Sequence, residues 1–154
     1  MLIYRLTRAK YTLRDGEGAR LHGGRWNHKG TPLIYGAASR ALCALEVLAN
    51  ADELGGDYVI TPIELPDDLD VTSRSLESLP LKWDATEPTD ETRDIGTDWA
   101  NGLTAAVLVV PSAVIAREYN YLLNPRHPDF VRIRFFSQEP FHFDDRLGRA
   151  FLKK

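Results

Sequence analysis

The chain has 154 residues, of which 44% are hydrophobic and 27% charged, the balance of an ordinary globular protein. This length fits one domain that buries about two-thirds of the surface its unfolded chain would expose. A net charge of −3 argues against broad nucleic-acid binding but leaves room for a small cationic site. No apolar run reaches the length of a secretory signal or a membrane span, so we expect a cytoplasmic protein without membrane or direct nucleic-acid contact.

The expected strands and helices follow each other irregularly along the chain. Strands are predicted at residues 2–6, 33–35, 57–65, 104–110 and 131–136, with a short extended piece around Phe141 and Phe143. Helices are predicted at 39–50 with Ser39 as N-cap, at 89–101 with Thr89 as N-cap, and at 144–153. The run at 104–110 is apolar and β-branched, which is typical of a central strand. The irregular order favours an α+β fold over a doubly wound sheet.

Breakers of regular structure mark the connections. Residues 8–22 predict a loop or a short helical turn, and Pro62 indicates an edge strand or a bulge. Residues 66–88, rich in proline and serine, predict an irregular surface segment with little order of its own. We expect its apolar residues, Leu79, Leu81 and Trp83, to pin it to the body of the protein. Residues 120–130 are interpreted as turn-rich, because prolines interrupt them twice.

The loop before the second strand concentrates residue types that bind ligands. Paired glycines there precede Arg25, Trp26 and Asn27, and glycine lets a backbone approach a ligand closely. A guanidinium group suits a phosphate or carboxylate, and an aromatic ring can stack on a flat ligand. The same residues also fit an ordinary turn with a surface ion pair and a core tryptophan, and that alternative stays open.

Glu46 is the unusual residue of an otherwise apolar helix. It lies about 40° around the helix axis from Leu42, so it borders the packed face. A carboxylate in that place must be paired, hydrated in a cleft or kept protonated. Arg25 is a candidate partner and a ligand-lined cleft a candidate setting; a solvated glutamate at the rim is the alternative. The one cysteine, Cys43, lies on the same helix without metal-ligand spacing around it and is interpreted as a core residue.

Ser112 directly follows the predicted central strand. The chain has no G-x-S-x-G motif, which weighs against a serine nucleophile. Ser112 then either caps a helical turn or orients a ligand or Glu46. Asn120 and Asn124 are expected to tie their turn together through bonds from side chain to backbone.

Four blocks together resemble the RES domain family: GGRWNHKGTPLIY, the helix that carries Glu46, VVPSAV around Ser112, and NYLLNPRHPDF. The resemblance runs over nearly the whole chain, so residues 1–154 are interpreted as one RES domain. By position, Arg25, Glu46 and Ser112 match the arginine, glutamate and serine that name the family, and Tyr35 matches its tyrosine. His28 stands where a proline or a small residue is more usual, and residues 66–88 look specific to this chain.

This resemblance implies a fold similar to that of ADP-ribosyltransferases, an α+β domain with a mixed, split sheet. It implies the toxin half of a RES–Xre toxin–antitoxin pair, which cleaves the nicotinamide–ribose bond of NAD and arrests growth. Water, phosphate or a protein side chain would accept the ADP-ribose. NAD is then a substrate, and no metal or other cofactor is expected. The implied partners are an Xre-type antitoxin that covers the active site and a second copy of the toxin.

The resemblance also assigns residues to roles. Glu46 would hold a ribose hydroxyl and stabilise positive charge on the ribose, Arg25 would neutralise the pyrophosphate, and Ser112 would position a hydroxyl or hold Glu46. The full set implied for NAD binding is Tyr4, Arg5, Arg25, Trp26, Asn27, Tyr35, Ser112 and Asn124. Two rivals remain, a mono-ADP-ribosyltransferase acting on a cellular protein and a non-catalytic NAD-binding module.

Overall fold

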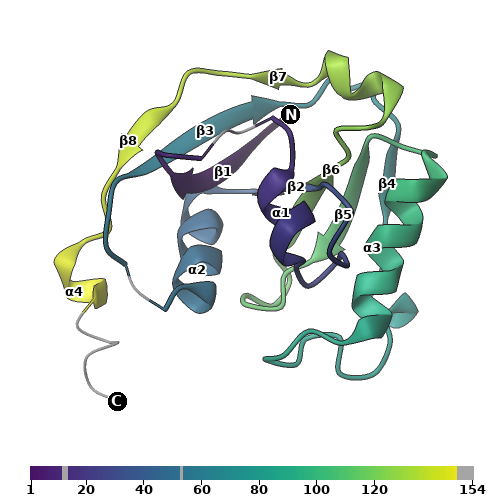
Figure 1. Ribbon diagram of the computed structural model, residues 1–154, viewed down its shortest axis with the longest axis horizontal. Coiled ribbons are helices and arrows are strands. Elements are labelled where there is room, and N and C mark those ends of the chain that lie inside the picture. The colour runs from purple at the N-terminus through teal and green to yellow at the C-terminus, as the bar shows by residue number, and fades with distance from the viewer. Residues whose placement is uncertain (12–13, 53, 149–154) are drawn as a thin grey trace.

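The computed structural model describes residues 1–11, 14–52 and 54–148 (Figure 1). The strands are β1 (Leu2–Arg8), β2 (Ile34–Ala37), β3 (Tyr58–Glu64), β4 (Val71–Ser73), β5 (Val107–Pro111), β6 (Tyr119–Leu123), β7 (Arg134–Phe135) and β8 (Glu139–Phe141). The helices are α1 (Glu17–His22), α2 (Arg40–Asn50), α3 (Asp90–Gly102) and α4 (Asp145–Gly148), with short 3₁₀ helices η1 (Leu76–Ser78) and η2 (Pro128–Arg132).

The described strands form one sheet. Its order is β4-β5-β6-β2-β1-β3-β7, and β8 pairs with β3 beside β7. Strand β4 runs parallel to β5, whereas the other ladders described are antiparallel. The predicted α+β class with a mixed sheet is therefore confirmed.

The sheet nearly divides between β1 and β2. These two strands pair at one position, Tyr4 opposite Ala37. By contrast, β1 pairs with β3 along its whole length, and β2 pairs with β6 along its whole length. One half of the sheet therefore holds β1, β3, β7 and β8, and the other holds β4, β5, β6 and β2. This is the split expected for the fold, and it opens a gap that the functional site uses.

Helices α2 and α3 cover the two halves separately. α2 packs on β1 and β3, and α3 packs on β5 and β6. Both helices lie on the same face of the sheet. Leu108, Leu122 and Tyr35 are paired across neighbouring strands and so point to one face, and Ala37, two residues after Tyr35, points to that face too. Leu108 and Leu122 pack with α3, and Ala37 packs with α2. Figure 1 shows α1 between these two helices, and Ala19 of α1 packs against the same cluster as α3.

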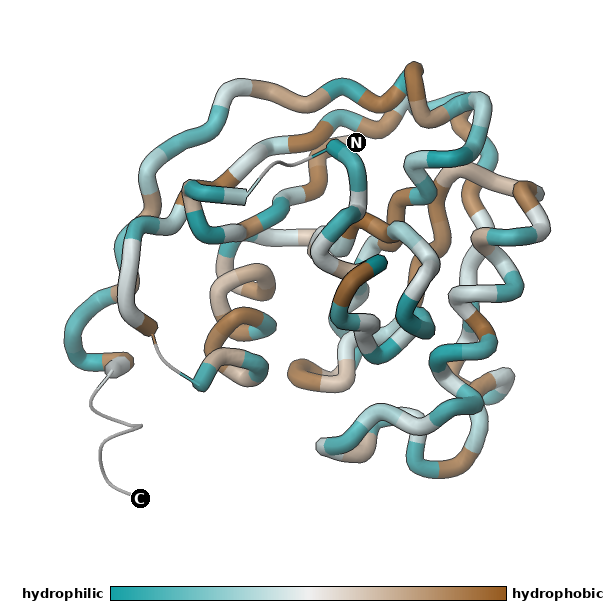
Figure 2. Tube along the Cα trace, viewed as in Figure 1, coloured by the Kyte–Doolittle hydropathy of each residue, from teal (hydrophilic) through white to brown (hydrophobic). Residues whose placement is uncertain are grey.

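The opposite face carries a second core that joins the two halves. Fully buried residues from five strands contribute to it: Ile3, Ile34, Ile63, Val107 and Leu123. Leu65, Leu69, Phe130 and Ile133 from the loops and η2 pack against them. Figure 2 shows β5 as mostly hydrophobic, as expected for a central strand, whereas most residues along α3 are hydrophilic.

Most predicted elements agree with the structure. Ser39 Oγ accepts a hydrogen bond from Leu42 N at 3.0 Å, and Thr89 Oγ1 accepts one from Thr92 N at 3.4 Å, so both predicted N-caps are confirmed. The strands predicted at 2–6, 57–65 and 104–110 form as β1, β3 and β5, and β5 has neighbours on both sides.

Two predictions about the connecting segments are wrong, and of the two alternatives for Pro62 only the edge strand is excluded. Residues 66–88 are not uniformly irregular, because β4 and η1 lie within them. Leu79 and Trp83 do pack against the core, but Leu81 is 91% exposed and pins nothing. The backbone bond from Trp83 N to Pro80 O closes a tight turn, which places Leu81 at its tip. Pro62 is not in an edge strand, since β3 pairs on both sides. Its carbonyl accepts from Phe136 N in the break between β8 and β7, where a missing N–H costs no ladder bond.

The segment after residue 119 was also misjudged. Asn120 to Leu123 are not a turn but the greater part of β6, which is held between β2 and β5. The predicted strand at 131–136 shrinks to β7, because η2 begins at Pro128, is capped by His127 Nδ1 and extends to Arg132. Val131, which lies in η2, is 87% exposed.

The helix predicted at 144–153 is described as α4 as far as Gly148, and its remainder lies outside the described residues. Within residues 1–11, 14–52 and 54–148, no helix combines the length and apolar character needed to cross a membrane.

Candidate active site

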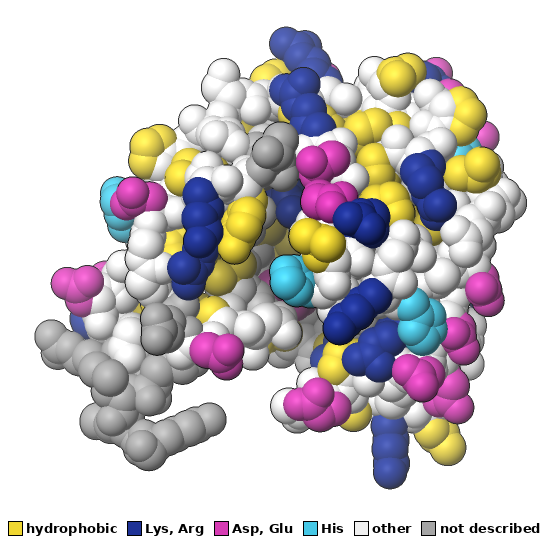
Figure 3. Space-filling model, in the orientation of Figure 1, with side chains coloured by type: hydrophobic (Ala, Val, Ile, Leu, Met, Phe, Trp, Pro, Cys, Tyr) yellow, Lys and Arg dark blue, Asp and Glu magenta, His cyan; other side chains and the backbone are white. Residues whose placement is uncertain are grey.

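A cleft of about 690 Å³ opens over the split in the sheet. Its floor comes from β1, β2 and β6, one wall from α2, and the other from α1, the loop at 23–26 and residues 84–88. Ala113 and Val114, after β5, close one side. Figure 3 shows the surface hollowed between the two walls. The volume lies within the usual range for small-molecule sites, about 300–1,000 Å³.

The glycine loop is built to bring Arg25 into this cleft. Gly23 has a φ of 70°, which favours glycine. A Cβ on Gly24 would lie 2.6 Å from the hydroxyl oxygen of Tyr35, so only glycine allows the loop to pass so close to β2. The loop thus makes a close approach to the protein's own Tyr35, while an approach to a ligand stays a prediction.

Asn27 and Tyr35 hold the loop from within. Asn27 is fully buried, and its Nδ2 donates to the carbonyl oxygens of Ala19, His28 and Thr31 at 2.9–3.1 Å. The Tyr35 hydroxyl donates to Asn27 Oδ1 at 2.6 Å and accepts from Trp26 N at 3.2 Å. Burial raises the pKa of Tyr35, so its hydroxyl stays neutral. These hydrogen bonds use both ends of the Asn27 amide to hold the loop, so Asn27 has a structural role. The Tyr35 side chain, in contrast, also lines the cleft.

Arg25 lies half-buried at the wall formed by residues 84–88. Its Nη1 donates to the carbonyl oxygen of Trp83 at 2.8 Å. Burial lowers the pKa of the guanidinium, and Glu46 and Asp84 oppose that shift. Among the described residues, Arg25 forms no salt bridge with Glu46, so the pairing considered from the sequence is not formed. The cation is therefore available to a ligand in the cleft.

Trp26 lies mainly in the core. Its side chain is 2% exposed and packs against the cluster that contains Trp99 and Leu108. Its ring lies 6.2 Å from that of Trp83 at an interplanar angle of 30°. Trp26 borders the cleft, but a ring so enclosed offers little face for stacking.

Glu46 projects from α2 into the cleft, where two side chains hold one of its carboxylate oxygens. Ser112 Oγ donates to Oε1 at 2.7 Å, and Asn120 Nδ2 donates to the same atom at 2.6 Å. Among the described residues both hydrogen bonds go to Oε1, which leaves Oε2 for a ligand. The cleft setting considered for Glu46 is thus the one observed.

Ser112 serves as a donor to Glu46 and as a cap. Its Oγ accepts hydrogen bonds from Val114 N at 3.1 Å and Ile115 N at 3.0 Å, so its own proton points to Glu46. The side chain is buried, and among the described residues no histidine forms a hydrogen bond with its hydroxyl. Both sequence interpretations of Ser112, cap and positioning group, therefore apply at once.

Arg5 brings a second cation to the cleft. Its Nη1 donates to the carbonyl oxygen of Tyr35 at 2.9 Å, which fills the gap where β1 and β2 do not pair. Burial lowers the pKa of Arg5 to about 10, so the group remains charged at neutral pH. Nε is buried without a partner among the described residues. Tyr4, the neighbouring residue, lies beneath the guanidinium of Arg40 at 5.0 Å and is not among the residues that line the cleft.

The structure reverses the expected positions of two asparagines: Asn120 lines the cleft, and Asn124 does not. Asn124 is fully buried away from the cleft, donates to the carbonyl oxygen of Ala100 at 2.8 Å and accepts from Arg126 N. Asn120, expected only to tie a turn, instead reaches Glu46. The structure thus gathers Arg5, Arg25, Tyr35 and Glu46 at one cleft, with Trp26 at its border and Ser112 behind Glu46, to which it is hydrogen-bonded. It leaves Tyr4, Asn27 and Asn124 outside.

The described part of the chain contains no cluster of three or more His, Cys, Asp or Glu side chains placed to hold a metal ion.

Comparison with solved structures finds a chain with the same fold. In the crystal structure of the M. tuberculosis MbcT–MbcA toxin–antitoxin complex, one chain matches with a TM-score of 0.77 and 21% identity. The match covers 99% of this chain and 87% of that chain. At this identity the likeness concerns the fold.

Sequence comparison identifies the family. The RES domain profile matches residues 2–144. Toxin Res of Photorhabdus laumondii is 39% identical over 155 residues, which cover 97% of this chain and 99% of that protein. The Prs ADP-ribosylating toxin of a Sphingobium species is 35% identical and covers 88% of this chain and 86% of its own length. The chain belongs to the RES domain family, and its relatives there are toxins.

Proposed function

We propose that this protein is the toxin of a RES–Xre toxin–antitoxin pair and that it cleaves the nicotinamide–ribose bond of NAD. The observation that carries the proposal is the Glu46 carboxylate, held by Oε1 in a cleft that also contains two cations. Such a site suits a substrate that carries a pyrophosphate and develops positive charge on a ribose.

The chemistry follows from the charge that the reaction creates. When the bond between ribose C1 and the nicotinamide nitrogen breaks, nicotinamide leaves as a neutral ring with the bonding electron pair, and the ribose becomes oxocarbenium-like. The free oxygen of Glu46 stabilises this cation and holds a ribose hydroxyl. Attack by water then gives ADP-ribose and a proton, and attack by phosphate gives the ADP-ribose phosphate ester. No metal or additional cofactor takes part in this scheme.

The cations suit the rest of the substrate. Arg25 and Arg5 both line the cleft without a carboxylate partner among the described residues. Guanidinium groups bind phosphate oxygens through charge-assisted hydrogen bonds. Tyr35 and the border of Trp26 supply apolar surface for a ring. A pyrophosphate bridging the two arginines would leave its ribose near Glu46.

The cellular role follows from consumption of NAD without return. Depletion of NAD would arrest growth, so the producing cell needs an inhibitor. The solved structural neighbour is a toxin bound to an antitoxin. We infer an Xre-type antitoxin that covers this cleft, and a toxin homodimer within the complex.

Product analysis on the purified chain tests the proposal. NAD labelled in the nicotinamide and adenine parts is incubated with the protein, with and without phosphate. Release of nicotinamide with free ADP-ribose identifies hydrolysis, and a phosphate-dependent ester identifies phosphorolysis. Tight NAD binding without any release would instead support a non-catalytic module and contradict the proposal.

One relative favours a second candidate, transfer of ADP-ribose to a protein. That relative is a Prs ADP-ribosylating toxin, 35% identical to this chain. The same carboxylate and cations serve both reactions, because they differ only in the acceptor. Labelled NAD added to a bacterial lysate distinguishes them: a labelled protein band that needs Glu46 favours transfer, and free ADP-ribose alone favours NAD degradation.

A further inference from the structure

Asn120 lies where it can control how Glu46 faces the cleft. It belongs to β6, with Ala37 of β2 and Val110 of β5 as its register partners. A residue paired on both sides in a sheet has a well-fixed backbone, which makes its side chain a precise support. Glu46, in contrast, sits on α2, which packs mainly on the other half of the sheet. The hydrogen bond from Asn120 Nδ2 to Glu46 Oε1, 2.6 Å long, therefore connects the two sides of the split.

The two donors on Oε1 act together. Ser112 accepts from Val114 N and Ile115 N, so its hydroxyl proton is directed at Glu46. The Asn120 amide supplies a second proton to the same oxygen. With Oε1 engaged from two directions, rotation of the carboxylate would break both bonds. Oε2 is then presented to the cleft in one orientation.

The oxygen of the Asn120 amide shows that this arrangement has a cost in stability. Its Oδ1 is buried and has no partner among the described residues. A buried acceptor without a partner is unfavourable by about 1–3 kcal/mol. Exchanging the amide oxygen and nitrogen would turn the oxygen toward the carboxylate, which is worse. The bond to Glu46 thus holds the amide in this orientation even though its oxygen has no partner there.

We propose that Asn120 is a positioning residue that, with Ser112, fixes the Glu46 carboxylate so that Oε2 faces the ribose of the substrate. The inference rests on the proposed function for its consequence in catalysis. Asn120 itself acts through Glu46, so removing it should impair turnover more than substrate affinity.

Asn120→Leu removes both polar ends of the side chain and keeps its branched shape, with larger methyl groups in place of the amide oxygen and nitrogen. We expect kcat for nicotinamide release to fall about 10- to 100-fold, because the carboxylate loses its fixed orientation, with KM changed less than about 3-fold. The melting temperature should not fall, because the unpartnered Oδ1 is removed with the bond. The matched control is Asn101→Leu, which changes an exposed asparagine outside the cleft and should keep wild-type kinetics.

Asn120→Asp separates a positioning role from a merely structural one. A protonated aspartic acid can donate to Oε1 as the amide does, whereas an ionised one repels Glu46. Two carboxyl groups this close retain one shared proton to higher pH than a lone group. We therefore expect activity near wild type at about pH 5 and a progressive loss toward about pH 8. Asn101→Asp should keep the wild-type pH profile.

Three results would overturn the inference: wild-type kcat in Asn120→Leu, a wild-type pH profile in Asn120→Asp, or a drop in kcat only in proportion to lost folded protein. Crystal structures of the wild type and Asn120→Leu test it even if neither protein releases nicotinamide. The carboxylate should leave its wild-type orientation in the variant, and an unchanged Glu46 would contradict the positioning role. Absence of release by the wild type alone would count against the proposed function and not against this role.

Discussion

Arg25 combines two tasks in one side chain. Its Nη1 holds the carbonyl oxygen of Trp83, and so ties the glycine loop to the wall at residues 84–88. Its remaining donors border the cleft. The same residue therefore contributes to the shape of the site and to its charge.

Arg25→Ala should weaken NAD use mainly through binding. We expect KM for NAD to rise at least about tenfold, since a charge-assisted contact to phosphate is lost. Loss of the bond to Trp83 should lower the free energy of unfolding by no more than about 1–3 kcal/mol. Kinetics and a thermal melt on the same preparation separate the two effects. Arg126→Ala, which removes a surface arginine bonded to Asn101, is the control; an unchanged KM in Arg25→Ala would remove Arg25 from the binding site.

Cys43 borders the cleft, but its thiol is expected to be unreactive. Its Sγ donates to the carbonyl oxygen of Tyr4 at 2.9 Å, and burial raises the pKa of the thiol to about 12. Only the thiolate reacts with an alkylating reagent, and at about pH 8 roughly one folded molecule in ten thousand carries it. We expect alkylation of the folded protein to be very slow and to speed up about tenfold per pH unit up to about pH 12.

The unfolded protein provides the comparison. In denaturant the thiol regains its ordinary pKa, near 8.5, so the rate should level off above about pH 9. Rapid alkylation of the folded protein at neutral pH would mean that Cys43 is exposed and activated, contrary to its burial.

At the residue scale, the sequence predicted the site only partly. Glu46 was recognisable because a carboxylate bordering an apolar helix face demands an explanation, and Arg25 because paired glycines precede it. Asn120 was missed because the prolines at 125 and 128 suggested a turn across the whole segment. Its hydrogen-bond partner Glu46 lies 74 residues earlier in the chain. The contact depends on the register of β6 against β2, which no local sequence pattern contains.

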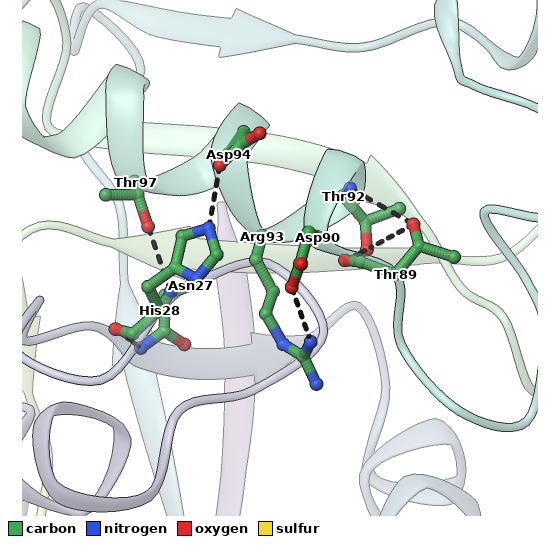
Figure 4. A network of polar contacts seen from close by, with 8 residues as sticks. All are labelled: Asn27, His28, Thr89, Asp90, Thr92, Arg93, Asp94 and Thr97. Carbon is green, nitrogen blue, oxygen red and sulfur yellow. Dashed lines mark hydrogen bonds and ion pairs between the residues drawn. The ribbon is translucent and has the colours of Figure 1, made fainter.

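Among the elements, α3 determines where the arginine loop sits. His28 N donates to Thr97 Oγ1 at 3.0 Å, and His28 Nε2 lies 2.7 Å from Asp94 Oδ1, so the loop is attached along α3 (Figure 4). Beside these contacts a Cβ on Gly96 would overlap the carbonyl oxygen of Trp26. His28, the residue that departs from the family pattern, thus contributes to the attachment.

Gly96→Ala should therefore displace the loop that carries Arg25. We expect a loss of about 1–3 kcal/mol in the free energy of unfolding and reduced NAD cleavage, because backbone must move to admit a methyl group. Gly102→Ala is a matched control on the same helix, since its Cβ would meet nothing within 4 Å. That variant should be neutral or stabilised by up to about 1 kcal/mol. Equal behaviour of the two variants, measured by denaturant unfolding, would contradict close packing at Gly96.

Elements with strong local signals were predicted well, and those set by their neighbours were not. The N-caps Ser39 and Thr89, together with apolar periodicity, predicted α2 and α3. β4 and β6 do not, because β4 is only three residues long and depends on pairing with β5. β7 was overestimated, since η2 takes up Val131 and Arg132 before the strand can begin.

At the scale of the whole molecule, the split sheet explains why the site lies where it does. The two halves share a core on one face, while α2 and α3 cover the other face separately. The cleft between them receives Glu46 from one half and Arg25, Ser112 and Asn120 from elements of the other. Composition and periodicity indicated the α+β class, but the single pairing of β1 with β2 is a tertiary property. The family resemblance supplied that expectation.

The most direct test of this account compares nicotinamide release from NAD by the wild type and by Glu46→Gln. Glutamine keeps the shape, and its carbonyl oxygen can still accept the hydrogen bonds from Ser112 and Asn120, but it removes the negative charge that stabilises the ribose cation. The account predicts folding like the wild type and a loss of at least about 100-fold in kcat. Glu91→Gln, an exposed helical glutamate outside the cleft, should retain full activity. A Glu46→Gln protein that releases nicotinamide at the wild-type rate would contradict the central role given to this carboxylate.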